Sequence, residues 1–450
     1  MTRRSLVLRG VACAALLAVL CPATALAAPS GASGREPAQA AVGSTSASGW
    51  REEADGWHYY DDGEELTGWH ELPTRDDPGV TSRYHFDDRT GAMDTLSLID
   101  DGEDGVRFVE EDGRMAAGKE VYDPASDAWY WADSVEVNDG RIAMGKDVYL
   151  PSNGGKWVRY DAEGRMVKGQ DGAVSPDDGQ WHWWYFDPVT GEMLKGFVYV
   201  PEDGKWCYYD PITGWMLYGE QYLVSDADNQ WHWYYFDPHT GAMDYEWAYI
   251  PSSGKWVYYD PTMGWMLYGS RMIDGRPYYL DPATGERLSH DEVVARLLAV
   301  AASQDGQTSG DGYEAALASV GKERNPNGPC MTYVWWCFHE AGMDFQFMDG
   351  QATSWPHEVA LWYEASGRLM HDDPQPGDIW LIYQNGAGPA PATHAGLVAS
   401  HPYYIDGEKY VDVWEFVNGW VHLQRENCVW YEGHLYGGSI TGFGRPLYND

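Results

Sequence analysis

The chain contains little cysteine and few basic residues. It has six cysteines among 450 residues, and its 30 Lys and Arg face 69 Asp and Glu, for a formal net charge of −39. So few cysteines exclude a disulfide-dense scaffold. Because a chain this acidic is poorly suited to bind nucleic acid or anionic surfaces by charge attraction, we expect no nucleic-acid partner. An anionic polymer would have to be recognised through aromatic stacking or a cationic substituent.

Long apolar runs are also scarce. One run, Val11–Leu20, follows three arginines and precedes the small-residue segment Ala25-Leu26-Ala27. This is the pattern of a secretory signal peptide over residues 1–27. Residues 28–48 are mostly Ala, Ser and Gly, which is typical of a flexible linker. No other stretch approaches the ~18 apolar residues that a transmembrane helix needs. The sequence therefore predicts an exported protein without a transmembrane segment.

Removal of the predicted signal peptide leaves four cysteines, Cys207, Cys330, Cys337 and Cys428. Cys330 and Cys337 lie in one segment that is predicted to be helical. A helix would separate them by roughly 10 Å, which is too far for a disulfide. A disulfide between Cys337 and Cys428 stays open.

Residues 49–288 contain an aromatic repeat. The segment Trp181–Met193 recurs as Trp231–Met243, and Gly204–Gly219 recurs as Gly254–Gly269, so the period is 50 residues with two half-units in each. Self-similarity at a fixed period indicates an array of stacked supersecondary units.

Each half-unit has the pattern of a β-hairpin. An aromatic strand leads into Asp-Pro-x-Thr-Gly, in which Pro pre-sets the turn and Gly supplies a positive φ. One hairpin has too little core to be stable alone, so consecutive hairpins must stack their aromatic side chains. The sequence therefore predicts a multidomain protein that begins with an all-β hairpin-repeat solenoid over residues 49–288. Cys207 aligns with Val257 and is expected to be a small apolar core residue.

These units resemble the cell-wall-binding repeats of the choline-binding and glucan-binding type, which occur on secreted proteins of Gram-positive bacteria. The resemblance implies aromatic cages for choline or aromatic contact surfaces for glucan, because ring faces attract a quaternary ammonium without hydrogen bonds. The ligand contacts that it implies here are Trp57, Tyr60, Trp69, Trp183, Trp206, Tyr209, Trp215, Trp233, Trp256, Tyr259 and Trp265.

The Gly-Trp pair of that family is kept only in part. It is present as Gly68-Trp69, but the matching positions downstream are Gly196-Phe197, Gly219-Glu220 and Gly269-Ser270. Wall teichoic acid, choline and glucan therefore all stay open as ligands of the repeats, beside peptidoglycan itself. The alternative is an array that packs only against itself and acts as a spacer.

Residues 289–450 show a different pattern. Ser289 is suited to cap a helix that runs from Asp291 to Ala302, with acidic residues in its first turn. A turn that leads into a buried strand is expected at residues 371–383, and further strands are expected at residues 393–399 and 410–419. Helices followed by antiparallel strands indicate an α+β domain.

Cys330 lies where the turn Asn325–Pro329 meets an apolar helix. Pro329 has no N–H to lose in a first helical turn, and Asn327 is suited to cap the helix. The positive end of the helix dipole favours a thiolate at Cys330. Because a buried cysteine alone is more often structural than reactive, the assignment of Cys330 as a nucleophile depends on partner residues later in the chain.

His394 begins a predicted strand, and Glu415 and Asn418 lie after it in the chain. An ordered series of Cys, His and an acid or amide is suited to acyl transfer: the thiolate attacks a carbonyl, the imidazole moves the proton, and the third group fixes the imidazole tautomer. The candidates are Cys330, His394 and then Glu415 or Asn418. His357, His401, His422 and His434 are scattered without metal-ligand spacing, so we expect them at surface or loop positions and not at a metal site. We also expect no cofactor.

The segments Gly328–Trp336, Pro376–Ile379 and His394–Val398, with Glu415 and Asn418, resemble a CHAP domain. CHAP domains are the cysteine, histidine-dependent amidohydrolases and peptidases of bacterial cell walls, papain-like in fold. The resemblance covers roughly residues 289–448. It implies that Cys330 is the nucleophile, that His394 is the general base and that Glu415 orients His394. Asn418 either assists Glu415 or replaces it, and the N–H of Cys330 is one oxyanion donor.

These resemblances imply a secreted, cell-wall-associated peptidoglycan hydrolase whose repeats hold it on the wall. The bond cut would be the N-acetylmuramoyl–L-alanine amide or an amide of the stem or crossbridge peptide, and the sequence leaves both open. The alternative is a non-catalytic surface adhesin, or a glucan- or choline-binding protein, with a degenerate CHAP-like domain.

Overall fold

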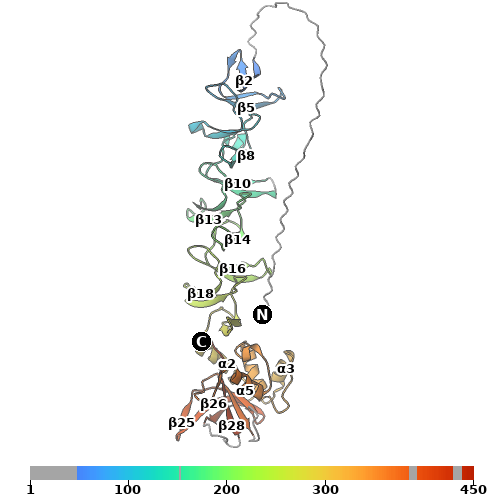
Figure 1. Cartoon of the computed structure of the whole chain (residues 1–450), viewed down its shortest axis with the longest axis vertical. Helices are drawn as coiled ribbons and strands as arrows, with labels where there is room; N and C mark the ends of the chain where they lie inside the picture. Colours follow the sequence, from blue (N-terminus) through green and yellow to red (C-terminus); the bar gives the residue numbers. More distant parts are fainter. Residues whose placement is uncertain (1–47, 152–153, 385–392, 429–437, 450) are drawn as a thin grey trace, which may run out of the picture. The chain divides into compact units, whose positions relative to one another are not determined.

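The computed structural model describes residues 48–151, 154–384, 393–428 and 438–449 (Figure 1). The predicted signal peptide and all of the predicted linker except Ser48 lie outside the described residues. The chain divides into two compact units: one contains the residues up to Leu96 together with Val109–Met115, and the other contains Ser97–Phe108 and the residues from Ala116 onward. In the part of the chain that the structure describes, no helix is long and apolar enough to cross a membrane.

Short hairpins make up the chain from residue 49 to residue 280. Their strands are β1 (Gly49–Glu53), β2 (Gly56–Asp61), β3 (Glu64–Glu65), β4 (Gly68–Pro73), β5 (Thr81–Phe86), β6 (Ser97–Asp100), β7 (Val106–Val109), β8 (Lys119–Asp123), β9 (Ala128–Ala132), β10 (Lys146–Leu150), β11 (Lys156–Tyr160), β12 (Gly169–Val174), β13 (Trp181–Phe186), β14 (Gly196–Val200), β15 (Lys205–Tyr209), β16 (Gly219–Val224), β17 (Trp231–Phe236), β18 (Glu246–Ile250), β19 (Lys255–Tyr259), β20 (Gly269–Ile273) and β21 (Arg276–Leu280).

The first three strands form one small sheet, and from β4 onward each strand pairs with its neighbour in sequence, β4 with β5 through to β20 with β21. Two short helices, η1 (Gly102–Asp104) and α1 (Val135–Asn138), lie between strands of this region. The predicted hairpin repeats are thus confirmed, whereas a solenoid path remains a prediction.

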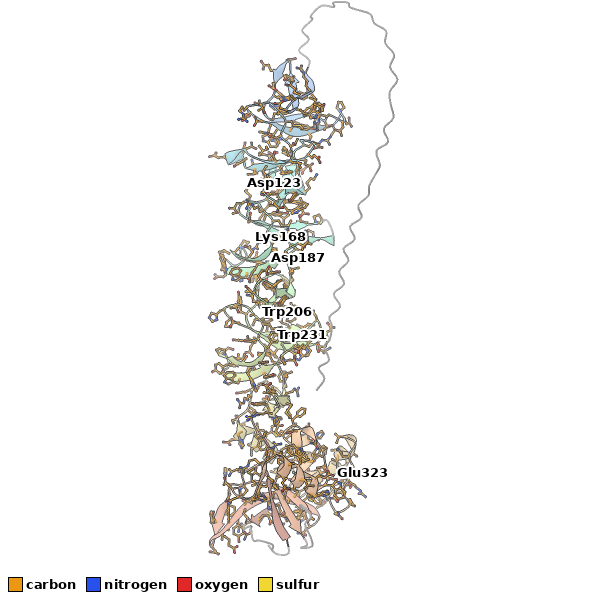
Figure 2. All side chains as sticks on the ribbon, in the orientation of Figure 1. Asp123, Lys168, Asp187, Trp206, Trp231 and Glu323 are labelled. Carbon is orange, nitrogen blue, oxygen red and sulfur yellow. The ribbon has the colours of Figure 1, made fainter. Side chains whose placement is uncertain are left out.

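In the repeats that contain Asp-Pro-x-Thr-Gly, the aspartate side chain holds the turn through hydrogen bonds to main-chain N–H groups. Asp187, labelled in Figure 2, accepts the N–H groups of Val189 (2.9 Å) and Thr190 (2.7 Å), and these hydrogen bonds lower its pKa. In the equivalent turn fifty residues later, Gly241 has φ +67°, and a Cβ there would lie 2.6 Å from Met216 Sδ. Both the positive φ and this close approach require glycine.

Equivalent residues fifty positions apart fill two equivalent cores. Tyr185, Val198, Val200, Cys207, Tyr209 and Met216 form one cluster, and Tyr235, Ala248, Ile250, Val257, Tyr259 and Met266 form the next. Main-chain bonds link neighbouring hairpins with the same period, since the N–H of Met216 donates to the carbonyl of Trp183 and that of Met266 to Trp233, both at 2.8 Å. Cys207 and Val257 are both fully buried, so the prediction that Cys207 is a core residue is confirmed.

The C-terminal region combines helices and one antiparallel sheet. The helices are α2 (His290–Ala302), α3 (Asp311–Ser319), α4 (Cys330–Glu340), η3 (Met348–Gly350) and α5 (Pro356–Ala365), and the strands are β22 (Leu369–Met370), β23 (Ile379–Gln384), β24 (His394–Val398), β25 (Tyr403–Ile405), β26 (Glu408–Val417), β27 (Trp420–Asn427) and β28 (Gly438–Gly444).

The sheet order is β22-β28-β23-β24-β26-β25, with β27 on β26. Helix α4 packs against β24 and β26 and against α2 and α3. Helix α2 begins with a capping box, in which Ser289 donates its N–H to Glu292 (2.8 Å) and accepts the N–H of Glu292 in return. The α+β architecture and the cap at Ser289 are therefore confirmed, whereas a papain-like fold stays a prediction.

The last hairpin shares the core of this C-terminal region. Tyr279, in β21, is fully buried in the same cluster as α2 and α4, and its hydroxyl donates to the carbonyl of Ala341 (2.9 Å). Asn449 accepts the N–H of Tyr279 (2.6 Å) and donates to the carbonyls of Tyr279 and Leu288, both at 2.7 Å. The predicted boundary at residues 288 and 289 therefore cuts through a packed and hydrogen-bonded contact.

Candidate active site and ligand surfaces

Cys330 is the first residue of α4 and is 8% exposed. The preceding turn is organised by the buried Asn325, which accepts the N–H of Asn327 (3.0 Å) and donates to the carbonyl of Ser354 (3.2 Å). Pro329, and not Asn327, occupies the N-cap position, and no side chain caps the helix. The predicted cap at Asn327 is therefore wrong. The N–H of Asn327 donates to the side chain of Asn325, so Asn327 belongs to the turn before the helix.

His394 and Glu415 meet directly in the sheet. His394 opens β24 and Glu415 lies in the neighbouring strand β26; both are almost fully buried. The Nε2 atom of His394 is 2.5 Å from Oε2 of Glu415. This leaves Nδ1 as the ring nitrogen for the Cys330 side chain, which is also hydrogen-bonded to His394. The indole of Trp380 packs edge-on against the imidazole, with ring centroids 6.1 Å apart.

The charge on His394 is set by these two neighbours. Burial alone lowers the pKa of His394, but the hydrogen bonds and charges of Cys330 and Glu415 outweigh it and raise the pKa to about 10. An imidazole with this pKa is protonated at neutral pH and stabilises a thiolate beside it. An arrangement of this kind is chemically able to supply a nucleophile, a proton carrier and an orienting carboxylate.

Gly396 has a role that sequence reasoning missed. It lies in β24 two residues after His394, and a Cβ there would be 2.5 Å from Val413 Cγ1 and 3.1 Å from Glu415 Cβ. Any larger residue would push β26, and Glu415 with it, away from β24. An isolated glycine within a strand pattern was the available signal, because it often marks a close approach.

Asn418 lies elsewhere. With Gly419 it forms the two-residue turn between β26 and β27, in which Val417 pairs with Trp420 and both turn residues have positive φ, +52° and +89°. The side chain is exposed, and Asn-Gly is the preferred sequence for this kind of turn. The structure thus brings Glu415 to His394 and gives Asn418 a role in the turn, which corrects its expected place at the site.

Glu426 is a second carboxyl group that sequence reasoning did not find. It lies in β27 and its side chain is hydrogen-bonded to Glu415. Burial and the charge of Glu415 raise the pKa of Glu426 to about 7. No local sequence signal distinguished it, because its position depends on the pairing of β26 with β27.

Cys207, Cys337 and Cys428 have thiols with raised pKa values. All four, Cys207, Cys330, Cys337 and Cys428, are free thiols, so the open Cys337–Cys428 disulfide is absent between these two described residues. Burial raises the pKa of Cys207 and of Cys428 to about 11 and raises that of Cys337 further. These three thiols are therefore protonated at neutral pH.

The eleven aromatic residues expected to contact ligand fall into distinct environments. Tyr209 and Tyr259 are fully buried core residues, which corrects their assignment, since no ligand reaches them from outside. Trp215 stacks on His182 with centroids 3.7 Å apart, and Trp265 stacks on His232 at 4.3 Å. These two rings therefore have one face covered by the protein itself.

In the first unit, arginines cover the expected ring faces. Arg51 lies 4.0 Å from the ring centroid of Tyr60, Arg75 lies 4.8 Å from Trp57, and Arg83 lies 5.4 Å from Trp69. A guanidinium over a ring satisfies the same attraction that would hold a ligand cation.

The four remaining residues are open to solvent: Trp183, Trp206, Trp233 and Trp256 are 37–50% exposed. Trp206, marked in Figure 2, pairs with Tyr199 at 5.5 Å and 56°, and Trp256 pairs with Tyr249 at 5.5 Å and 51°. Trp206 also lines a cavity of about 220 Å³ with Phe197, Tyr234 and Asp226. These four rings are the most exposed of the expected set.

The hairpin region and the C-terminal region are similar to different known proteins. Residues 321–413 match the family model of the CHAP domain; this range includes Cys330 and His394 and ends just before Glu415. No curated protein matched the chain.

The hairpin region is similar to solved choline-binding proteins of Streptococcus pneumoniae. Choline binding protein F is 23% identical, with a TM-score of 0.37 over 54% of this chain and 87% of that one. The modular autolysin LytC, solved with a synthetic peptidoglycan ligand, is 16% identical, with a TM-score of 0.30 over 53% of this chain and 52% of that one. The choline-binding domain of CbpL is 18% identical, with a TM-score of 0.21 over 44% and 97%.

Proposed function

We propose that the protein is a secreted peptidoglycan hydrolase, a cysteine-dependent amidase or endopeptidase that its hairpin repeats hold on the cell wall. The observation that carries this proposal is the buried contact series from Cys330 through His394 to Glu415, within and beside a segment that matches the CHAP domain.

The chemistry depends on the charges at this site. The Cys330 thiolate attacks the amide carbonyl carbon, and the N–H of Cys330, in the first helical turn where N–H groups have no partner within the helix, stabilises the oxyanion. Protonated His394 gives its proton to the leaving amine as the C–N bond breaks, which leaves a thioester. His394 then takes a proton from water, whose oxygen attacks the thioester; the C–S bond breaks, the acid product leaves, and the thiolate of Cys330 and the protonated His394 are restored. Glu415 holds the imidazole in one tautomer and balances its charge.

The repeats supply attachment. Exposed tryptophans on successive hairpins suit the flat faces of sugar rings, and several weak contacts on one polymer combine into firm attachment. The cavity at Trp206 favours a second ligand, because four aromatic rings beside the carboxylate of Asp226 suit a quaternary ammonium such as choline. A protein attached in this way keeps its catalytic domain close to substrate.

The decisive experiment measures loss of turbidity of purified Gram-positive walls with the protein and with Cys330→Ala and His394→Ala. We expect the unaltered protein alone to clear the walls, and mass spectrometry of the new fragment ends to name the bond that is cut. If all three proteins bind walls and none releases fragments under reducing conditions, catalysis is refuted and the chain is a binder. Sedimentation with walls or with glucan, with and without free choline, separates the ligands of the repeats.

A further inference from the structure

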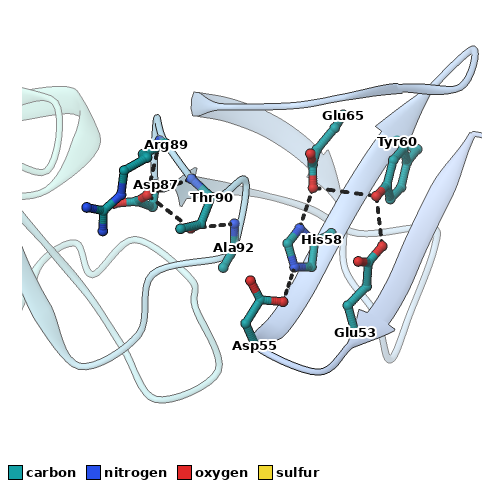
Figure 3. Close-up of polar contacts among 9 residues, drawn as sticks. All are labelled: Glu53, Asp55, His58, Tyr60, Glu65, Asp87, Arg89, Thr90 and Ala92. Carbon is teal, nitrogen blue, oxygen red and sulfur yellow. Dashed lines mark hydrogen bonds and ion pairs between the residues drawn. The ribbon is translucent and has the colours of Figure 1, made fainter.

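A cluster of metal-ligating groups lies in the first hairpin, far in sequence from the residues of the catalytic series. The turn between β1 and β2 places Glu53 opposite Gly56, so that Glu53 and Asp55 approach His58 of β2 (Figure 3). One ligand atom from each of Glu53, Asp55 and His58 lies within 4.8 Å of the others. A fourth residue, Glu65 of β3, contacts His58 from the other side.

The imidazole of His58 carries the inference. His58 is 2% exposed, and each of its ring nitrogens faces a carboxylate: Nδ1 is 2.5 Å from Glu65 Oε1 and Nε2 is 3.1 Å from Asp55 Oδ1. With Glu65 on Nδ1, the Nε2 atom faces Asp55, and a cation bound at Nε2 would lie within reach of the carboxylates of Asp55 and Glu53.

Three carboxylate side chains, those of Glu53, Asp55 and Glu65, surround the imidazole of His58. A carboxylate that accepts the second N–H of a histidine is the usual partner of a metal-bound imidazole, because it fixes the tautomer and the ring orientation. Glu65 is in that position, and the Tyr60 hydroxyl likewise orients Glu53 by donating to its Oε1 at 2.7 Å.

We propose that Glu53, Asp55 and His58 form a zinc-binding site in the first hairpin, with Glu65 as the positioning residue for His58. One imidazole nitrogen and two carboxylate oxygens are ligands that Zn²⁺ accepts, whereas Ca²⁺ and Mg²⁺ prefer oxygen alone. Tetrahedral ligands about 2 Å from an ion are about 3.3 Å apart, so ligand atoms that now lie within 4.8 Å of one another must approach by up to about 1.5 Å. Asp55 is 58% exposed, which leaves an entry path and an open fourth position for water.

Zinc at this site would cross-link the turn of β1 and β2. An ion bound by Glu53 and Asp55 at the turn and by His58 in β2 would restrain the turn and strengthen the hairpin. The spacing Glu-x-Asp-x-x-His is not one of the common zinc signatures. The inference is independent of the chemistry at Cys330.

The test uses zinc titration of the chelator-treated protein in a Cys330→Ala background, which removes the reactive thiol as a competing ligand. We expect one tight site by calorimetry and a rise in melting temperature with ZnCl₂. His58→Ala and Asp55→Asn should weaken binding at that site at least 100-fold, and Glu65→Ala about 10- to 100-fold. The matched control is Glu52→Gln, which removes the neighbouring exposed charge in β1 and should leave affinity unchanged.

Asp55→Asn guards against a misfolded His58 variant, because Asp55 lies in the exposed turn. Equal affinity and stoichiometry in the unaltered protein and in Asp55→Asn would overturn the proposal. So would the absence of tight binding in the unaltered protein, which would leave a protonated His58 between carboxylates as the explanation of the cluster. An equal loss of affinity in Glu52→Gln would show a diffuse charge effect and would also overturn it.

Discussion

The hairpin repeats and the C-terminal domain use their residues in opposite ways. In the repeats, Cys207 and Val257, or Trp206 and Trp256, occupy equivalent positions fifty residues apart. In the domain, Cys330, His394 and Glu415 have no repeated equivalents; Cys330 contacts His394, and His394 contacts Glu415. Repetition spreads a function over many similar residues, whereas a catalytic series depends on every member. The effect of a substitution should therefore depend more on the region than on the residue type.

The largest expected difference lies between two thiols of the same helix. Cys330→Ala should lower the rate of wall lysis by at least about 10³-fold, because it removes the proposed nucleophile. Cys337→Ala, in the buried interior of α4, should lower stability by about 1–2 kcal/mol and leave the rate of the folded protein unchanged. The measurement is initial lysis rate per folded molecule. Equal losses in both variants would refute a catalytic role for Cys330.

A smaller loss is expected when the charge beside His394 is removed. Because the pKa of His394 is raised from 6.5 to about 10, the protonated ring stabilises the fold fully below pH 6.5, and this contribution is lost as the pH rises through about 10. Glu415→Gln removes one cause of the raised pKa. It should lower the rate at neutral pH about 10²-fold and move the alkaline limb of the pH–rate profile to lower pH.

The control for this prediction is Glu408→Gln, which removes an exposed carboxylate from the same strand. Its pH–rate profile should match that of the unaltered protein. If the alkaline limb of Glu415→Gln stays in place while the rate falls, Glu415 holds His394 by position and not by charge.

The contact between the last hairpin and the domain should give an intermediate effect on stability. Asn449→Ala removes three hydrogen bonds to the main chain of Tyr279 and Leu288 and leaves buried polar groups without partners. We expect the free energy of unfolding to fall by about 2–4 kcal/mol, measured by urea denaturation. A change below about 0.5 kcal/mol would show that hairpin and domain are energetically separate.

The smallest effect is expected in the repeats. Trp206→Ala should weaken sedimentation with walls only a few-fold, because Trp183, Trp233 and Trp256 remain exposed. Replacing all four should weaken it at least about 100-fold, since linked weak contacts multiply. Ile212→Ala, at an exposed turn residue, is the control and should have no effect. A complete loss with Trp206→Ala alone would locate binding at the Trp206 cavity instead of along the repeats.

The sequence predicted the periodic features best, because a fifty-residue repeat shows its own pattern twice. The hairpins, the core position of Cys207 and the cap at Ser289 all depend on local chemistry, and all are confirmed. The ring faces could not be predicted in this way, because Arg51, Arg75 and Arg83 reach their rings through cross-strand and longer contacts that no local pattern reveals.

The third site residue shows the same limit. Glu415 and Asn418 both come after His394 in sequence, and the Asn-Gly signal for a hairpin turn was present at Asn418 but unused. Only the pairing of β24 with β26 brings Glu415 to the imidazole. Gly396 and Glu426 were missed for the same reason, since their roles depend on what a neighbouring strand places beside them.

The shared core at Tyr279 also limits how this protein can be recombined with others. A module excised at residue 289 would lose Tyr279 from its interior and leave Asn449 without its main-chain partners. A chimaera whose junction falls before Gly269 would keep β20 and β21 with the domain that they support. The exchangeable unit of this chain is thus one hairpin longer than its aromatic repeat pattern indicates.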